Sequence, residues 1–239
     1  MSDANAVTVD VRRAPQRFHT RLPWLDSWHS FSFGEHYDPD NTHHGLLLVN
    51  NDDTVEPRSG FGTHSHRDME IVTWVLSGEL EHRDSAGHHG VIRPGVAQRM
   101  SAGRGVAHSE QNPSPDEAVH FVQMWVLPDT RGLDPSYEQR DIGPSIARGV
   151  LTPVASGRAH DGAVSIHQRD AVLWCAHLEP GDTVRLPGAL HVHVFVTRGG
   201  AALDGTELSA GDAVRLTHAG EQSLSGTRDG TEILVWETA

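Results

Sequence analysis

The chain of 239 residues contains a single cysteine, Cys175, and therefore cannot form an intramolecular disulfide. No uninterrupted apolar run approaches the roughly 18 residues that a membrane-spanning helix needs. The first residues, Met1 to Asn5, show neither the basic nor the apolar stretch of a signal peptide. These absences predict a cytoplasmic protein that does not associate with a membrane.

Basic residues are also scarce, with 19 Lys and Arg against 32 Asp and Glu and a formal net charge of −13. Such a negative field repels phosphate backbones, and no local basic cluster is present to overcome it. We therefore expect no direct binding to nucleic acid. The sequence also lacks a G-x-S-x-G nucleophile motif, a G-x-x-x-x-G-K phosphate loop and a G-x-G-x-x-G motif that opens a helix.

Short apolar runs punctuated by 24 glycines and 13 prolines make up most of the chain, which is typical of β-sandwiches and barrels. No comparable stretch sustains a 3.6-residue period, although residues 134–140 are predicted to form a short helical turn. The sequence therefore predicts an all-β fold. The strand-like runs are Ile71 to Leu76, Leu80 to Arg83, His120 to Leu127, Ala171 to Leu178 and Leu190 to Thr197.

The two halves of the chain share their pattern of turns, with a connection at about residues 132–144. The first half has Arg93-Pro94-Gly95, and the second has Glu179-Pro180-Gly181-Asp182 and Ser209-Ala210-Gly211-Asp212. We interpret the halves as two small β-barrel domains joined by short helical connections, over residues 1–135 and 136–239.

Two pairs of metal-ligating side chains stand at the same spacing. His64 and His66 are separated by one residue, as are His108 and Glu110, so each pair shares one face of a strand. In a chain with 18 histidines one such pair is usually incidental, but both follow glycine-rich segments that allow close backbone approach. Three imidazole nitrogens and one carboxylate oxygen suit Fe, Mn, Co, Ni, Cu or Zn, and disfavour Ca and Mg.

The residues around these pairs resemble the pirin family of the cupin superfamily. Residues 61–70 resemble its first metal motif and residues 100–110 its second, while residues 24–33 resemble its N-terminal signature. His120 to Trp125 and Tyr137 to Arg140 are similar to the shorter bacterial members.

The resemblance implies a bicupin fold with one divalent transition metal in the N-terminal barrel and none in the C-terminal barrel. Its ligands fall on His64, His66, His108 and Glu110. Iron is the expected ion, with Ni, Mn, Co, Cu and Zn as alternatives. In many cupins the carboxylate follows the two histidines closely, which here would be Glu70. We favour Glu110 as the ligand and expect Glu70 to be a group of the pocket or to support the ligands.

Bacterial members close to this pattern are known as quercetin 2,3-dioxygenases. The resemblance therefore implies a metal-dependent dioxygenase that cleaves a flavonol-like substrate with O₂. We expect Glu110, with Glu70 as the less favoured alternative, to be the catalytic group that accepts the hydroxyl proton. An alternative is a non-enzymatic regulatory protein whose surface engages a protein partner according to the oxidation state of the metal. A third is another metal-assisted chemistry, such as isomerisation or hydrolysis. We expect a monomer.

Other candidates are weaker. His191 and His193 repeat the spacing in the second half, but no matching partner pair follows, so no metal site is expected there. The adjacent pairs His43-His44 and His88-His89 lie among turn residues and are expected to be solvated. Cys175 lies in an apolar run and is expected to be part of the core.

Overall fold

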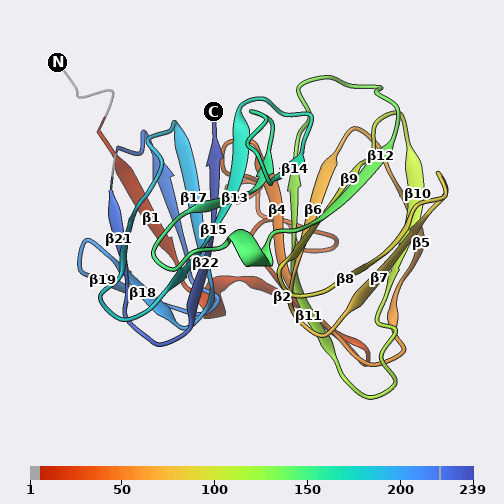
Figure 1. Cartoon of the computed structure of the whole chain (residues 1–239), viewed down its shortest axis with the longest axis horizontal. Helices are drawn as coiled ribbons and strands as arrows, with labels where there is room; N and C mark the ends of the chain where they lie inside the picture. Colours follow the sequence, from red (N-terminus) through yellow and green to blue (C-terminus); the bar gives the residue numbers. More distant parts are fainter. Residues whose placement is uncertain (1–5, 221) are drawn as a thin grey trace.

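The computed structural model describes residues 6–220 and 222–239, so the expectation for Met1 to Asn5 lies outside the described residues. The described chain is almost entirely β-structure, and two barrel-like halves stand side by side (Figure 1). One barrel contains the orange to green strands, and the other contains the teal to blue strands together with the red strand β1 (Thr8–Arg12). The all-β, two-domain prediction is thereby confirmed. No helix among these residues is both long and apolar enough to cross a membrane.

The N-terminal barrel consists of a seven-stranded sheet in the order β12-β9-β6-β11-β4-β3-β2 and a four-stranded sheet in the order β5-β10-β7-β8. Its strands are β2 (Phe18–Leu22), β3 (Leu25–His29), β4 (Leu47–Val55), β5 (Gly60–His66), β6 (Glu70–Ser77), β7 (Leu80–Asp84), β8 (His89–Ile92), β9 (Val96–Ser101), β10 (Val106–Gln111), β11 (Val119–Val126) and β12 (Ser136–Asp141).

The C-terminal barrel has the same composition, with sheets in the orders β1-β20-β17-β22-β15-β13-β14 and β16-β21-β18-β19. Two short 3₁₀ helices, η1 (Ala14–Gln16) and η2 (Gly143–Ser145), lie in connecting segments. The strands are β1 (Thr8–Arg12), β13 (Thr152–Ser156), β14 (Val164–Ser165), β15 (Ala171–Leu178), β16 (Thr183–Arg185), β17 (His191–Arg198), β18 (Gly200–Leu203), β19 (Thr206–Ser209), β20 (Ala213–Thr217), β21 (Ser223–Gly226) and β22 (Thr231–Thr238).

The two large sheets pack face to face and bury a core between the barrels. Along β6, Val72, Trp74 and Leu76 belong to this shared core, whereas Ile71 and Val75 belong to clusters inside the N-terminal barrel. Both faces of β6 are therefore buried, which explains its continuous apolar run. Only alternate residues of that run can line the interior of the N-terminal barrel. The other residues of the run pack against the C-terminal barrel.

Strand pairing crosses the expected boundary between residues 135 and 136 in two places. β1 pairs with β20 in the C-terminal barrel, and β12 pairs with β9 in the N-terminal one. The predicted helical turn at residues 134–140 was wrong, because most of this segment belongs to β12. The free edge of β9 offers a full ladder of antiparallel hydrogen bonds, and this pairing outweighs a weak local helical preference.

Candidate metal centre

Strands β5 and β10 bring the two histidine-containing pairs together. In their antiparallel register His64 lies opposite His108, and Val106 lies opposite His66. The ring centroids of His64 and His66 are 4.8 Å apart, those of His64 and His108 4.4 Å, and those of His66 and His108 4.9 Å. One nitrogen from each ring lies within 4.8 Å of the others. The three predicted imidazoles therefore converge on one point.

Glu110 is the fourth predicted residue and lies on the same strand, after a β-bulge at His108/Glu110. Its side chain is buried, and one oxygen accepts a 2.7 Å hydrogen bond from Gln123 Nε2. Trp125 Nε1 donates to the other end of that amide at 3.1 Å, which turns the Gln123 NH₂ toward the carboxylate. The second carboxylate oxygen of Glu110 has no hydrogen-bond partner among the described residues. Burial raises the pKa of Glu110 to about 7, despite the bond from Gln123.

The protonation of the histidines suits metal binding. Burial, assisted by neighbouring imidazoles, lowers the pKa of His66 to about 4 and that of His108 to about 3, so both rings are neutral at pH 7. Their Nε2 atoms are buried and without a protein partner in the described chain. The His64 Nδ1 lies 2.8 Å from the Gly62 carbonyl, which leaves its Nε2 free to act as a ligand. Because buried polar atoms are rarely left unpaired, these donors fit a bound cation.

A further buried histidine, His82 on β7, lies beside the site and was missed by the sequence reasoning. It is opposite Glu110 in the β-ladder, and its Nδ1 is 3.4 Å from His108 Nδ1. Its Nε2 is 3.3 Å from an Asp84 oxygen, and the Tyr137 ring stacks on it. These contacts engage the Nδ1 of His108 and leave its Nε2 without a protein partner in the described chain, as carboxylate–imidazole partners do in many metal sites. The sequence does contain one signal for His82, since His82 and Asp84 are separated by one residue just before a turn and so share a face of the strand.

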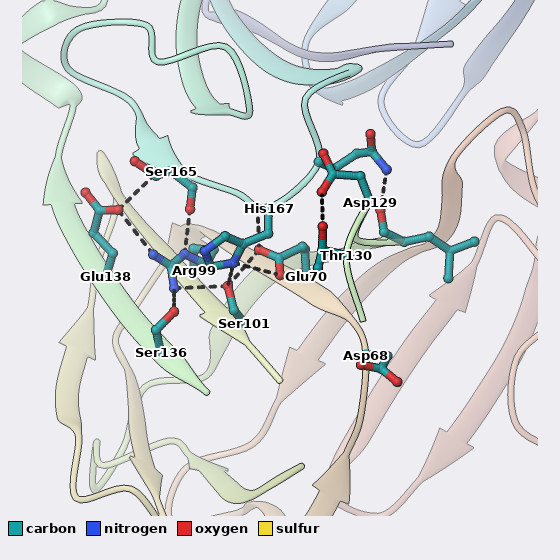
Figure 2. Close-up of polar contacts among 12 residues, drawn as sticks. Asp68, Glu70, Arg99, Ser101, Asp129, Thr130, Ser136, Glu138, Ser165 and His167 are labelled. Atoms are coloured by element: carbon teal, nitrogen blue, oxygen red, sulfur yellow. Dashed lines mark hydrogen bonds and ion pairs between the residues drawn. The ribbon is translucent and has the colours of Figure 1, made fainter. Parts of the chain in front are cut away.

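Glu70 lies outside the group formed by His64, His66, His108 and Glu110. Its carboxylate accepts hydrogen bonds from Ser101 Oγ at 2.7 Å and from the His167 backbone at 3.0 Å, in the junction between the barrels (Figure 2). A shared face with His64 and His66 would require one regular strand, but β5 ends at His66. The chain then turns through Asp68, at a φ of 49°, and enters the other sheet. Glu70 therefore points away from the histidines.

Aromatic and apolar side chains form one wall of the site. The Trp125 ring meets His66 edge-on, at 4.8 Å between centroids, and Phe33 packs against Trp125. Ile71 and Met100 belong to a buried cluster that Trp125 also contacts. A surface hollow of about 430 Å³ lies beside His66. The site thus combines polar donors with an apolar wall, as small-molecule sites commonly do.

A second buried acid, Asp53 on β4, also lies on a strand of this barrel. It accepts a hydrogen bond from Ser27, but burial, with smaller contributions from Asp52 and Glu110, raises its pKa to about 7. The folded protein thus favours the protonated form, whereas the unfolded chain ionises near pH 4. Asp53 contributes a stability penalty that grows as pH rises from about 4 to about 7 and is constant above.

We expect Asp53→Asn to remove this penalty in the metal-free protein. The difference in unfolding free energy between variant and wild type should be small at pH 4 and should grow by up to about 1.4 kcal/mol per pH unit toward pH 7. Urea denaturation at a series of pH values measures it. A difference that does not change with pH would contradict a protonated Asp53.

The paired barrels and the convergent imidazoles with a buried carboxylate define a two-domain cupin protein. Comparison with known proteins narrows this class, because the pirin family model matches residues 9–126 and the quercetinase C-terminal cupin domain matches residues 153–238. The chain belongs to the pirin family.

The relatives span nearly the whole chain. A Mycobacterium tuberculosis protein named putative quercetin 2,3-dioxygenase is 56% identical, covering 96% of this chain and 95% of its own. The quercetin 2,3-dioxygenase of Escherichia coli is 37% identical, with coverages of 96% and 98%. The crystal structure of the bacterial pirin YhhW from Escherichia coli in complex with nickel(II) superposes with a TM-score of 0.89 at 36% identity, covering 97% of this chain and 99% of that one.

Proposed function

We propose that this protein is a metal-dependent dioxygenase that cleaves a flavonol-type ring with O₂. The supporting observation is the convergence of the His64, His66 and His108 imidazoles, beside which a Glu110 carboxylate oxygen lies within 4.8 Å of a His108 nitrogen and one Glu110 oxygen stays without a hydrogen-bond partner among the described residues. The quercetin 2,3-dioxygenase names of full-length relatives supply the reaction.

We assign the metal to His64, His66, His108 and Glu110, of which the three histidines meet within 4.8 Å. A divalent ion fits this donor set, and a relative carries nickel. We propose iron as the resident ion, while Ni, Mn, Co, Cu and Zn would satisfy the same ligands. When bound, the ion supplies Lewis-acid stabilisation of the substrate oxygens.

The protein's own groups handle the proton and the ring. Glu110 accepts the proton of the flavonol 3-hydroxyl: the substrate O–H bond breaks and a carboxyl O–H bond forms. In the metal-free chain, burial raises the pKa of Glu110 to about 7, well above the usual value of a carboxyl group. Gln123 holds the carboxylate in place through its 2.7 Å hydrogen bond. Trp125 and Met100 offer an apolar wall for a flat aromatic substrate.

The first test combines elemental analysis with a quercetin assay on one sample. We expect at least one transition metal per chain and oxygen-dependent loss of the flavonol absorbance. Glu110→Gln keeps the shape and the Gln123 contact but removes the base, so kcat should fall by about 10²- to 10⁴-fold. Measuring its metal content separates loss of the base from loss of the ion. Stoichiometric metal without turnover on any flavonol would refute the dioxygenase and favour the non-enzymatic regulatory alternative.

A further inference from the structure

A second group of metal-ligating side chains lies between the barrels, outside the site described above. Cys175 and His177 lie two residues apart on β15, and Glu232 lies on the neighbouring β22. One ligand atom from each, the sulfur, a ring nitrogen and a carboxylate oxygen, lies within 4.8 Å of the other two. None of the three takes part in the proposed dioxygenase chemistry.

The sheet register explains why these atoms meet. His177 lies directly opposite Glu232 in the antiparallel ladder, and Cys175 lies two pairs further along, opposite Leu234. Residues two apart share a face, so all three side chains project toward the N-terminal barrel. Cys175 belongs to the core between the barrels, as expected from its apolar run, and is fully buried.

The surroundings fix the carboxylate in place. Trp74 Nε1 donates to Glu232 at 3.2 Å and Thr197 Oγ1 donates to the same oxygen at 2.8 Å. The other oxygen lies 3.0 Å from His177 Nε2. Burial alone would raise the pKa of Glu232, but the hydrogen bonds from His177, Thr197 and Trp74 outweigh it and lower the pKa. The group is therefore an ionised, oriented ligand.

Two of these residues, His177 and Glu232, are reached from solvent through a cleft. His177 and Glu232 line a cleft of about 320 Å³ between the barrels, together with Glu179 and Arg198. Cys175 is fully buried, and its sulfur lies within 4.8 Å of a ligand atom of each of the other two residues. The His177 side chain is 48% exposed, whereas that of Glu232 is 11% exposed. An ion entering the cleft would meet the imidazole first and the thiol last.

We propose that Cys175, His177 and Glu232 form a second metal site, for a divalent cation of borderline softness such as Zn²⁺ or Co²⁺. A thiolate and a carboxylate together balance the two positive charges, and an imidazole completes three ligands with a fourth position open to the cleft. The sulfur distinguishes this site from the nitrogen- and oxygen-lined centre in the N-terminal barrel.

Binding has a defined proton balance. Burial and the Glu232 charge raise the pKa of the Cys175 thiol, so the free site holds the protonated form. A metal–sulfur bond replaces the S–H bond, and one proton per ion leaves to solvent.

Cobalt(II) titration of the metal-free full-length chain tests the proposal, with the His66→Ala background to weaken the first site. Because the chain has one cysteine, a thiolate-to-cobalt charge-transfer band can only report Cys175. We expect this band to saturate at one ion per chain, to be absent in Cys175→Ala, and to need at least about tenfold more cobalt in His177→Ala or Glu232→Gln.

The outcomes are distinct from those for the dioxygenase. No charge-transfer band in excess cobalt would overturn the second site whatever the quercetin assay shows. A band whose titration midpoint is unchanged in both His177→Ala and Glu232→Gln would also overturn it, because the thiol would then bind without its partners. Glu232→Gln retains the acceptor for Trp74 and Thr197, and circular dichroism checks that each variant is folded.

Discussion

Replacing His66 with alanine should reduce the metal content of the N-terminal barrel from one ion per chain to a small fraction, with little loss of fold. His66 supplies one of three converging imidazoles, and its Nε2 has no protein partner within the described residues. Its truncation therefore removes a ligand while breaking no hydrogen bond of that atom. Burial already holds the ring neutral at pH 7, so no buried charge is lost either.

The apolar core should keep the variant folded. Ile71, Met100 and Val106 form a buried cluster that does not depend on an ion. Elemental analysis after gel filtration measures the metal, in a Cys175→Ala background that removes the thiolate of the proposed second site, and far-ultraviolet circular dichroism measures the fold. Quercetin turnover should fall with the metal.

His43→Ala is the matched control, because His43 is exposed and lies outside both strands that carry the proposed ligands. It should retain the metal and the activity of the wild type. If His66→Ala instead kept one ion per chain in the N-terminal barrel, the ligand assignment would be wrong. Loss of metal together with loss of the native spectrum would show that the ion itself stabilises the fold.

The geometry of the ligand pairs was predictable because it depends on local rules. Two residues separated by one position on a strand share a face, whatever the rest of the fold does. That rule placed His64 beside His66, and it required only that β5 and β10 be neighbours. The bulge at His108/Glu110 could not be predicted, since a bulge depends on the partner strand.

Glu70 shows where the same rule stops. Its even spacing from His64 and His66 would place it on their face only if one strand continued through all three residues. The chain turns at Asp68 instead. His82 shows the opposite case. Its position beside His108 comes from the pairing of β7 with β10, which brings together residues 26 positions apart. Nothing local in the sequence fixes such a long-range pairing, and the exchange of β1 and β12 between halves escaped prediction for the same reason.

Arg99→Met should lower the unfolding free energy by about 3–5 kcal/mol, the usual cost of removing one partner from a buried charged network. The Arg99 side chain is 7% exposed and joins strands of both barrels (Figure 2). Its guanidinium donates to the Ser165 carbonyl at 2.6 Å, to Ser136 Oγ at 2.7 Å and to Glu138 at 3.3 Å. Methionine fills a similar volume but leaves these acceptors without their donor.

The substitution should weaken the contact between the two barrels in particular, because Glu70 is 2% exposed and interacts with Arg99 at this contact. Without the guanidinium, its carboxylate keeps the Ser101 and His167 bonds but loses the nearby positive charge. Unfolding in guanidinium chloride, followed by tryptophan fluorescence, measures the change. Since Ser165 and His167 come from the C-terminal half, the two barrels should also separate at a lower denaturant concentration than in the wild type.

Arg104→Met is the matched control, with the same substitution at an exposed ion pair. Arg104 lies 2.8 Å from Asp134, but both side chains are more than two-thirds exposed, at 70% and 79%. Solvent already screens that pair, so the denaturation midpoint should stay close to that of the wild type. Equal midpoints for the two variants would mean that water replaces the Arg99 bonds and that the apolar core alone holds the barrels together. A much larger loss of unfolding free energy in Arg99→Met than in Arg104→Met would show that this polar network holds the two barrels in their relative position.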